Sequence, residues 1–211
     1  MDEASPIRNG QGSIPPTRHW LTTRRAACWA KAPQASASAP WPMIASPSSA
    51  AAEVRFSSEL LTGVLDCSIP YLGERRGRKV LLLEFPHGEI PFGAERLTAW
   101  LLQRNIVPMI AHPERNKGIM RSPSKLKPFI QQGCLLQVTA SSVAGRFGPA
   151  AQEIAHALLE EGVVTILASD AHNLQHRPPL LDEGMQHAAD LIGANKAEAL
   201  VKQTPWLIAQ S

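Results

Sequence analysis

Four apolar runs of strand length recur along the chain after residue 78, and each is followed by a stretch that can form a helix before the next run begins. The runs cover residues 79–86, 106–113, 134–140 and 163–168. Near-continuous apolar strands that alternate with helices are typical of parallel βα units, whose sheets are covered on both faces. The pattern therefore predicts an α/β fold built on a parallel sheet.

Between these runs, apolar side chains recur at helical spacing. The predicted helices cover residues 57–65, 94–104, 122–132, 150–161, 181–191 and 196–204. Alternation over residues 53–56 predicts one more strand, and residues 71–78 are predicted to be a charged turn. No internal repeat is evident beyond the recurring βα unit.

The first fifty residues differ in kind from the remainder, because Ala, Pro and Ser make up nearly half of them. Prolines interrupt every helical period there, and no strand alternation survives. We expect residues 1–50 to be a disordered segment and residues 51–211 to be the folded domain. The segment is basic, so a transit peptide is an alternative interpretation, whereas the absence of an apolar core argues against a secretory signal.

Composition restricts the function classes. A net charge of +3 is too small to indicate a nucleic-acid partner. No apolar run is long enough for a membrane span. Three widely spaced cysteines without a C-x-x-C motif favour a reduced, cytoplasmic setting. We expect Cys134, which lies in an apolar run, to be a buried small hydrophobe.

Acidic and imidazole side chains stand at the ends of three of the four apolar runs. They are Glu84, His112 and the pair Asp170 and His172. Side chains at the carboxyl ends of parallel strands gather at one edge of the sheet, and these types bind divalent metals. In a strand, Asp170 and His172 would share a face. The alternative for this last pair is a helix N-cap by Ser169 or Asp170.

Arginines stand in the loops after three of the four apolar runs, 106–113, 134–140 and 163–168, at Arg115, Arg146 and Arg177. A guanidinium fork matches two phosphate oxygens, so arginines beside metal ligands indicate a phosphate ligand. The alternative for each is an exposed ion pair or a side chain that lies along the surface. His87, in a loop, and His156, within a helix, are interpreted as structural.

Short sequence blocks occur at the predicted strand ends and in the loops that follow them. They are Glu53-Val54-Arg55, Glu84-Phe85-Pro86, Ala111-His112-Pro113-Glu114-Arg115, Leu136-Gln137-Val138-Thr139-Ala140, Gly145-Arg146-Phe147-Gly148, Ala168-Ser169-Asp170-Ala171-His172-Asn173 and His176-Arg177-Pro178-Pro179. Taken together and in this order, these blocks resemble the CpsB/CapC family of bacterial metal-dependent protein-tyrosine phosphatases in the PHP (polymerase and histidinol phosphatase) superfamily. The resemblance covers about Ala51 to the end of the chain.

The resemblance implies a distorted (βα)7 PHP barrel with a cluster of divalent metals at its mouth, usually manganese, with iron or magnesium as alternatives. It implies that Arg115 and Arg177 bind the substrate phosphate. It also implies that the substrate is the tyrosine-rich tail of a bacterial kinase that governs capsule or exopolysaccharide export. By motif, the implied metal ligands are Glu53, Glu84, His112, Asp170 and His172.

The amino-terminal segment departs from the family pattern. Family members begin with a strand that bears Asp-x-His-x-His, and residues 1–52 contain no such motif, His19 being their one histidine. We therefore expect an incomplete barrel without its first strands. A shifted reading frame in GC-rich DNA is our hypothesis for this segment, and translation of the upstream DNA in the other two frames would test it.

Three functions remain open from the sequence. The first is a protein-tyrosine phosphatase. The second is an inactive or impaired remnant of that family, which would bind metal weakly. The third is a PHP phosphoesterase that acts on a small phosphate ester. Chemistry by a cysteine nucleophile is excluded, because none of the three cysteines has an arginine six positions later.

Overall fold

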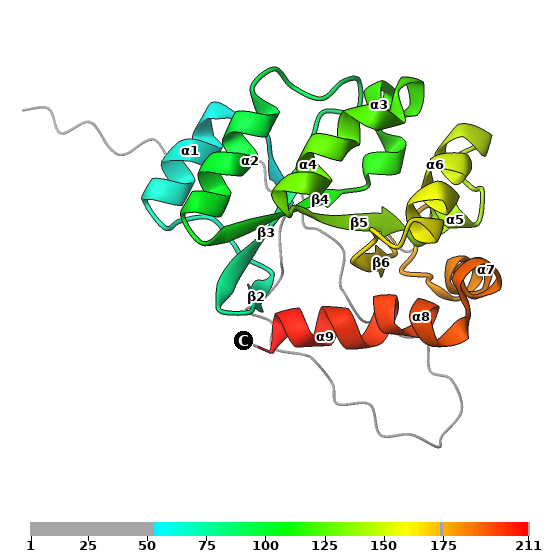
Figure 1. The fold of residues 1–211 in the computed structure, drawn as a ribbon. Helices are drawn as coiled ribbons and strands as arrows, with labels where there is room; N and C mark the ends of the chain where they lie inside the picture. The colour runs from blue at the N-terminus through cyan, green and yellow to red at the C-terminus, as the bar shows by residue number, and fades with distance from the viewer. Residues whose placement is uncertain (1–52, 174, 211) are drawn as a thin grey trace, which may run out of the picture.

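The computed structural model describes residues 53–173 and 175–210, so the predictions made for residues 1–50, including His19, lie outside the described residues. Within these residues, one six-stranded sheet has the order β1-β3-β4-β5-β6, with β2 pairing to β3 (Figure 1). The strands of the main path all run parallel, whereas β2 is antiparallel to β3. The predicted α/β fold with a parallel sheet is confirmed.

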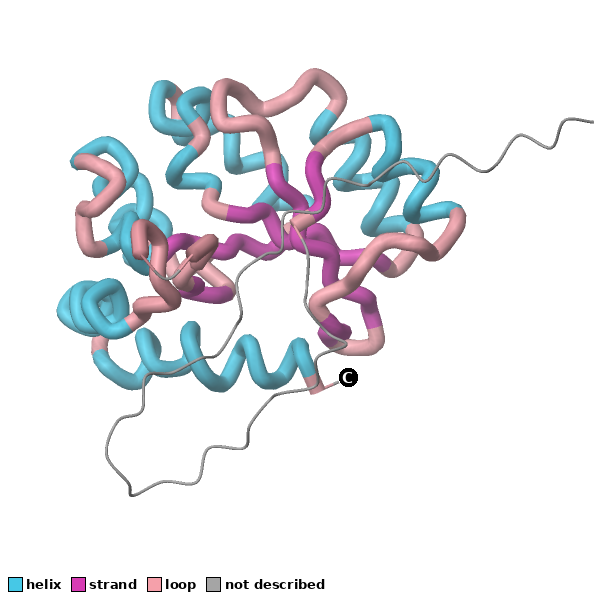
Figure 2. Tube along the Cα trace, turned by 180° about the vertical axis from the view of Figure 1, so that it is seen from behind, coloured by secondary structure: helices cyan, strands magenta, loops and turns pink. Residues whose placement is uncertain are grey.

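The strands form the centre of the molecule (Figure 2), and β3, β4, β5 and β6 are mostly apolar. Their bounds are β1 Val54–Arg55, β2 Gly73–Arg75, β3 Arg78–Glu84, β4 Ile106–Ala111, β5 Leu135–Thr139 and β6 Ile166–Ala168. Alternate residues of β3 face opposite sides of the sheet. Leu81 and Leu83 belong to one buried apolar cluster, and Val80 and Leu82 belong to a second.

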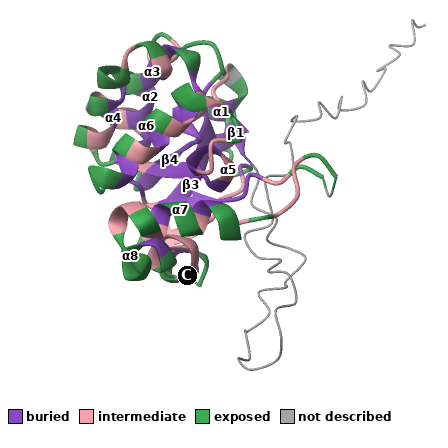
Figure 3. Cartoon of the chain, turned by 90° about the vertical axis from the view of Figure 1, so that its right-hand side faces the viewer, coloured by how far each residue is buried: buried purple, intermediate pink, exposed green. Residues whose placement is uncertain are grey.

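Helices cover both faces, as a buried parallel sheet requires. They are α1 Ser58–Leu65, α2 Ala94–Gln103, α3 Lys117–Arg121, α4 Lys127–Gln132, α5 Ala140–Val143, α6 Pro149–Glu160, α7 Asp182–Ile192, α8 Ala194–Glu198 and α9 Thr204–Ala209. The larger cluster includes Leu101 of α2 and Phe129 of α4, and the smaller includes Ile208 of α9. Figure 3 shows the buried strands enclosed by helices whose outer faces are exposed.

Two differences from the prediction concern strands. The predicted charged turn over residues 71–78 instead contains β2, which forms a hairpin with β3 and pairs Glu74 with Lys79. The predicted strand over residues 163–168 is shorter, because the Val163 N–H bonds to the Leu158 carbonyl and so still closes helix α6. Only Ile166–Ala168 forms β6.

The short helices α3 and α5 were not predicted, and two of the predicted helices differ in the structure near a proline. The predicted helix over residues 122–132 is split into a 3-10 turn, Pro123–Leu126, and α4. Pro128 has no N–H to bond back to the preceding turn, which favours this break. The last predicted helix extends to Ala209 as α8, a π-helical segment Ala199–Gln203 and α9. Pro205 is the second residue of α9, and its missing N–H suits the wider π turn before the helix.

None of the helices in the described ranges combines the length and the apolar character that crossing a membrane requires.

Candidate metal centre and phosphate site

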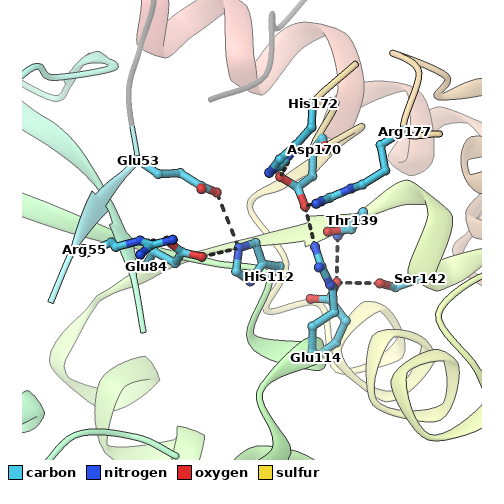
Figure 4. A network of polar contacts seen from close by, with 11 residues as sticks. Glu53, Arg55, Glu84, His112, Glu114, Thr139, Ser142, Asp170, His172 and Arg177 are labelled. Carbon is cyan, nitrogen blue, oxygen red and sulfur yellow. Dashed lines mark hydrogen bonds and ion pairs between the residues drawn. The ribbon is translucent and has the colours of Figure 1, made fainter. Parts of the chain in front are cut away.

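Three of the strands bring the predicted acidic and imidazole side chains to one edge of the sheet (Figure 4). Glu84 ends β3, and His112 follows β4 directly. β1 pairs Val54 with Leu83 near the end of β3, so Glu53 comes to the same edge although it precedes its strand. The parallel register is therefore what gathers residues from separate parts of the chain.

His112 lies between two carboxylates. Its Nε2 is 3.4 Å from Oε1 of Glu53 and 3.6 Å from Oε1 of Glu84, and all three residues are buried. His112 has a left-handed backbone conformation, with φ of 34°, and so turns the chain sharply after β4. Such conformations in residues other than glycine carry strain and cluster at functional sites.

The interaction between His112 and Glu53 shifts the pKa values of both groups. Burial opposes the charged form of His112, but the hydrogen bond and the charge of Glu53 outweigh it, so the pKa of His112 is raised. Burial likewise opposes the charged form of Glu53, and the interaction with His112 outweighs it, so the pKa of Glu53 is lowered. The interaction therefore favours the charged forms of both His112 and Glu53.

Asp170 lies on the other side of the site, where Arg115 and Arg177 both donate hydrogen bonds to its Oδ2. Asp170 is buried and has a left-handed conformation, with φ of 49°. An anion bound here would compete with the Asp170 carboxylate for both guanidinium groups.

The predicted reason for the pairing of Asp170 and His172 is wrong. β6 ends at Ala168, so the two residues do not share a strand face. Instead, Nδ1 of His172 lies 2.9 Å from the backbone carbonyl oxygen of Asp170 and 3.6 Å from its Oδ1. The N-cap alternative is also wrong, because the next helix, α7, begins only at Asp182.

A closed loop delivers Arg177 to Asp170. The His172 N–H bonds to the Arg177 carbonyl at 3.0 Å. The Asn173 side-chain oxygen accepts hydrogen bonds from the backbone N–H groups of Gln175, His176 and Arg177. Asn side chains commonly stabilise turns in this way.

The donor set suits a divalent cation. One oxygen of Glu53, one nitrogen of His112 and one oxygen of Asp170 all lie within 4.8 Å of one another. Two carboxylates and an imidazole are ligands that manganese, iron and zinc accept. Converging buried carboxylates repel each other, and a bound cation would offset that repulsion. The site therefore fits a divalent metal, with Glu84 next to His112 and His172 next to Asp170.

The three predicted arginines separate into two groups. Arg115 and Arg177 are partly buried at the site. Arg146 instead forms an exposed ion pair with Glu183, with its Nη2 2.5 Å from Oε2. For Arg146 the surface alternative is therefore correct.

Sequence reasoning missed two side chains that contact proposed site residues, one beside His112 and one beside Glu84. The His87 ring stacks on the His112 ring with a centroid distance of 5.6 Å and an interplanar angle of 23°, so His87 lies at the site. Arg55 donates a hydrogen bond of 3.1 Å from Nε to Oε2 of Glu84. Arg55 follows Glu53 by two residues, and this spacing could have indicated that Arg55 lies at the site. Nothing in the sequence indicated the stacking of His87. His156 is structural as predicted, with its Nε2 2.9 Å from the Val143 carbonyl oxygen.

Glu114 supports the turn between His112 and Arg115. Its side chain is fully buried, and Oε1 accepts hydrogen bonds from the Thr139 N–H at 3.1 Å and the Ser142 hydroxyl at 2.7 Å. Burial raises the pKa of Glu114 against these interactions. Its contacts fasten the turn that carries Arg115 to the end of β5.

Fold and site together define an α/β protein with a candidate divalent-cation centre and two arginines at the carboxyl edge of a parallel sheet. The family model described as "Capsular polysaccharide synthesis, CpsB/CapC" matches residues 45–209, and the chain belongs to this family.

Individual relatives agree with this assignment. The chain is 35% identical to CapC of Staphylococcus aureus over 131 residues, 62% of this chain and 50% of that protein. It is 39% identical to the tyrosine-protein phosphatase YwqE of Bacillus subtilis over 99 residues, 47% of this chain and 39% of that protein. The chain thus spans half or less of the length of these two relatives.

A solved structure is similar as well. It comes from a study of YwqE from Bacillus subtilis and CpsB from Streptococcus pneumoniae, described as metal-dependent tyrosine phosphatases. The match has a TM-score of 0.67 and 29% sequence identity, and it covers 75% of this chain and 62% of that chain.

Proposed function

We propose that this chain is a metal-dependent protein-tyrosine phosphatase that hydrolyses phosphotyrosine on a bacterial tyrosine kinase of capsule or exopolysaccharide biosynthesis. One observation carries the proposal. The acidic and imidazole cluster of Glu53, His112 and Asp170 shares its Asp170 carboxylate with Arg115 and Arg177. A cation site and a phosphate site therefore meet at one side chain.

The proposed metal ligands are Glu53, Glu84, His112, Asp170 and His172, and manganese is the proposed metal. A divalent metal, when bound there, lowers the pKa of coordinated water and offsets the charge of a phosphate group. Arg55 would orient Glu84 through the hydrogen bond that it donates to Oε2. Such outer contacts fix the direction in which a ligand oxygen points.

Arg115 and Arg177 are the proposed phosphate-binding residues. Their guanidinium groups now meet one carboxylate oxygen. If Asp170 turns its charge toward a cation, the two arginines become available to the substrate phosphate. They would bind its equatorial oxygens and stabilise the charge that these carry in the transition state. A tyrosine phenol, with a pKa of about 10, is a better leaving group than an alkyl alcohol.

We extend the proposal to the barrel fold and to the cellular location of the protein. The curved parallel sheet of residues 53–210 would be the part of a distorted (βα)7 PHP barrel that follows its first strands. The folded domain proposed for residues 51–211 would act on its kinase partner in the cytoplasm. The match of the family model over residues 45–209 supports this extent.

Hydrolysis of p-nitrophenyl phosphate with and without Mn²⁺ tests the proposal. Turnover that requires Mn²⁺ and that is lost in His112→Ala supports it. Comparison of a phosphotyrosine peptide with histidinol phosphate then separates a tyrosine phosphatase from an enzyme for small esters. Preference for histidinol phosphate would contradict the proposed substrate.

A second candidate function is a non-catalytic remnant of the family. The observation in its favour is that residues 1–52 contain no Asp-x-His-x-His motif, although the family resemblance leads us to expect one. Absence of turnover with any substrate, in a protein that folds, would favour this candidate.

A further inference from the structure

A four-residue turn between α5 and α6 places one aromatic side chain against both site arginines. Gly145 and Gly148 flank the turn with φ of 79° and 91°, and the Gly148 N–H bonds to the Gly145 carbonyl at 3.0 Å. Left-handed conformations of this kind favour glycine. Between these glycines, Arg146 pairs outward with Glu183, and Phe147 lies on the side of the site.

Phe147 contacts the two arginines through its ring. The guanidinium carbon of Arg115 lies 4.2 Å from the ring centroid, and that of Arg177 lies 5.8 Å from it. Both distances fall within the range of cation–π attraction. Phe147 thus contacts both of the guanidinium groups that hold Asp170.

Part of the Phe147 ring remains free for a ligand. The residue is 36% exposed, although its neighbours Arg115 and Arg177 are largely covered. An exposed aromatic surface next to two convergent cations is a combination that an aryl phosphate matches. Its phosphate would meet the arginines, and its ring would meet the phenyl group.

We propose that Phe147 is a specificity-determining residue that favours aryl phosphate esters over alkyl phosphate esters. The inference rests on the proposed function, because it assigns the substrate class at that same site. The anion carries most of the affinity, and the ring contact adds the discrimination. An aromatic pair of this kind changes affinity by roughly two- to tenfold.

Binding of phenylphosphonate and methylphosphonate separates the ring from the anion. Neither probe can be hydrolysed, so calorimetric titration of the Mn²⁺-supplemented full chain reports affinity without turnover. Phe147→Leu keeps an apolar side chain but removes the ring. Phe92→Leu is the matched control, because Phe92 is 99% exposed in the loop between β3 and α2.

The expected result is a preference of wild type and Phe92→Leu for phenylphosphonate that falls by roughly fivefold in Phe147→Leu. A role confined to holding the arginines would weaken both probes equally and leave their ratio unchanged, and this result would overturn the inference. Thermal melting of each variant excludes loss of fold as the cause.

The inference and the proposed function fail in different ways. Mn²⁺-dependent turnover with an unchanged probe ratio in Phe147→Leu would leave the function and remove the inference. A probe ratio that depends on Phe147, in a protein without turnover, would support the inference and contradict the proposed function. Failure of the wild type to bind either probe would overturn both.

Discussion

Nε2 of His112 and Oε1 of Glu53 lie 3.4 Å apart in the interior, although Glu53 directly precedes β1 and His112 directly follows β4. The contact joins a group whose pKa is raised to one whose pKa is lowered. These opposite shifts make the stability of the metal-free protein depend on pH. A divalent cation bound at the site would compete with the proton for Nε2 of His112.

The first prediction follows from the signs of these two shifts. A raised pKa of His112 gives stability that is complete below its ordinary value of 6.5 and is lost as pH rises through the folded-state value. A lowered pKa of Glu53 gives stability that is present above its ordinary value of 4.5 and is lost as pH falls through the folded-state value. Metal-free protein should therefore lose stability from this pair as pH rises above 6.5.

Urea denaturation in EDTA across this pH range measures the effect, and His112→Gln is the variant in which the loss should become smaller. Added Mn²⁺ should reverse the trend, because a metal binds the neutral imidazole and its affinity increases with pH. An identical pH dependence in wild type and His112→Gln would contradict the assignment.

The second prediction concerns the carboxylate that occupies both arginines. Asp170→Asn should increase the affinity of the metal-free protein for inorganic phosphate by about tenfold, because the competing charged acceptor is removed. Calorimetric titration in EDTA measures this change. Glu183→Gln is the matched control, because it frees the exposed Arg146 instead and should leave phosphate affinity unchanged. Weaker binding by a folded Asp170→Asn protein would show that Arg115 and Arg177 do not bind phosphate.

The third prediction concerns the cysteines. Burial raises the pKa of the Cys134 thiol to about 12, despite the opposing hydrogen bond with Thr98, whereas Cys67 is exposed. The folded thiol therefore stays protonated where an unfolded one ionises, and its stabilising contribution is lost as pH rises from 9.0 toward about 12.

A Cys28→Ser background leaves only these two thiols for measurement. In the folded protein near pH 8, a thiol reagent should label Cys67 and spare Cys134, and denaturant should expose both. Equal labelling rates in the folded protein would contradict the burial of Cys134.

The fourth prediction tests how helix α7 packs. A Cβ added at Gly184 would come within 2.3 Å of the Ala140 carbonyl oxygen, which is backbone and cannot move aside cheaply. Gly184→Ala should therefore destabilise the fold by about 1–3 kcal/mol. Gly88→Ala is the control, since a Cβ there meets nothing within 4 Å. Equal unfolding midpoints for the two variants would show that α7 and α5 are farther apart than described.

The strands β3 and β4 were predictable because their apolar runs are long and both faces are buried. β2 was not, since it is short and charged and exists only through its pairing with β3. β6 was predicted too long because hydropathy does not show that Val163 still closes the preceding helix. The local hydropathy pattern is therefore sufficient to predict strands that are buried throughout. It is insufficient where a hydrogen bond to another element determines whether a strand forms or where it begins.

The same distinction applies to the site. His112 was locatable from its position after an apolar strand. The geometry of Asp170 and His172 was not, because a left-handed residue breaks the strand alternation on which the expectation was based. The contacts of His87 and Phe147 arise between separate loops, and their spacing in the sequence carries no signal of them.

Metal content measured after dialysis with Mn²⁺ and gel filtration tests the central claim most directly. The wild type and His187→Ala, a control in the exposed face of α7, should retain about one or more metal ions per chain, and His112→Ala should lose most of them. A stoichiometry near zero in the wild type, or equal retention by folded His112→Ala protein, would contradict the claim that Glu53, His112 and Asp170 hold a divalent cation.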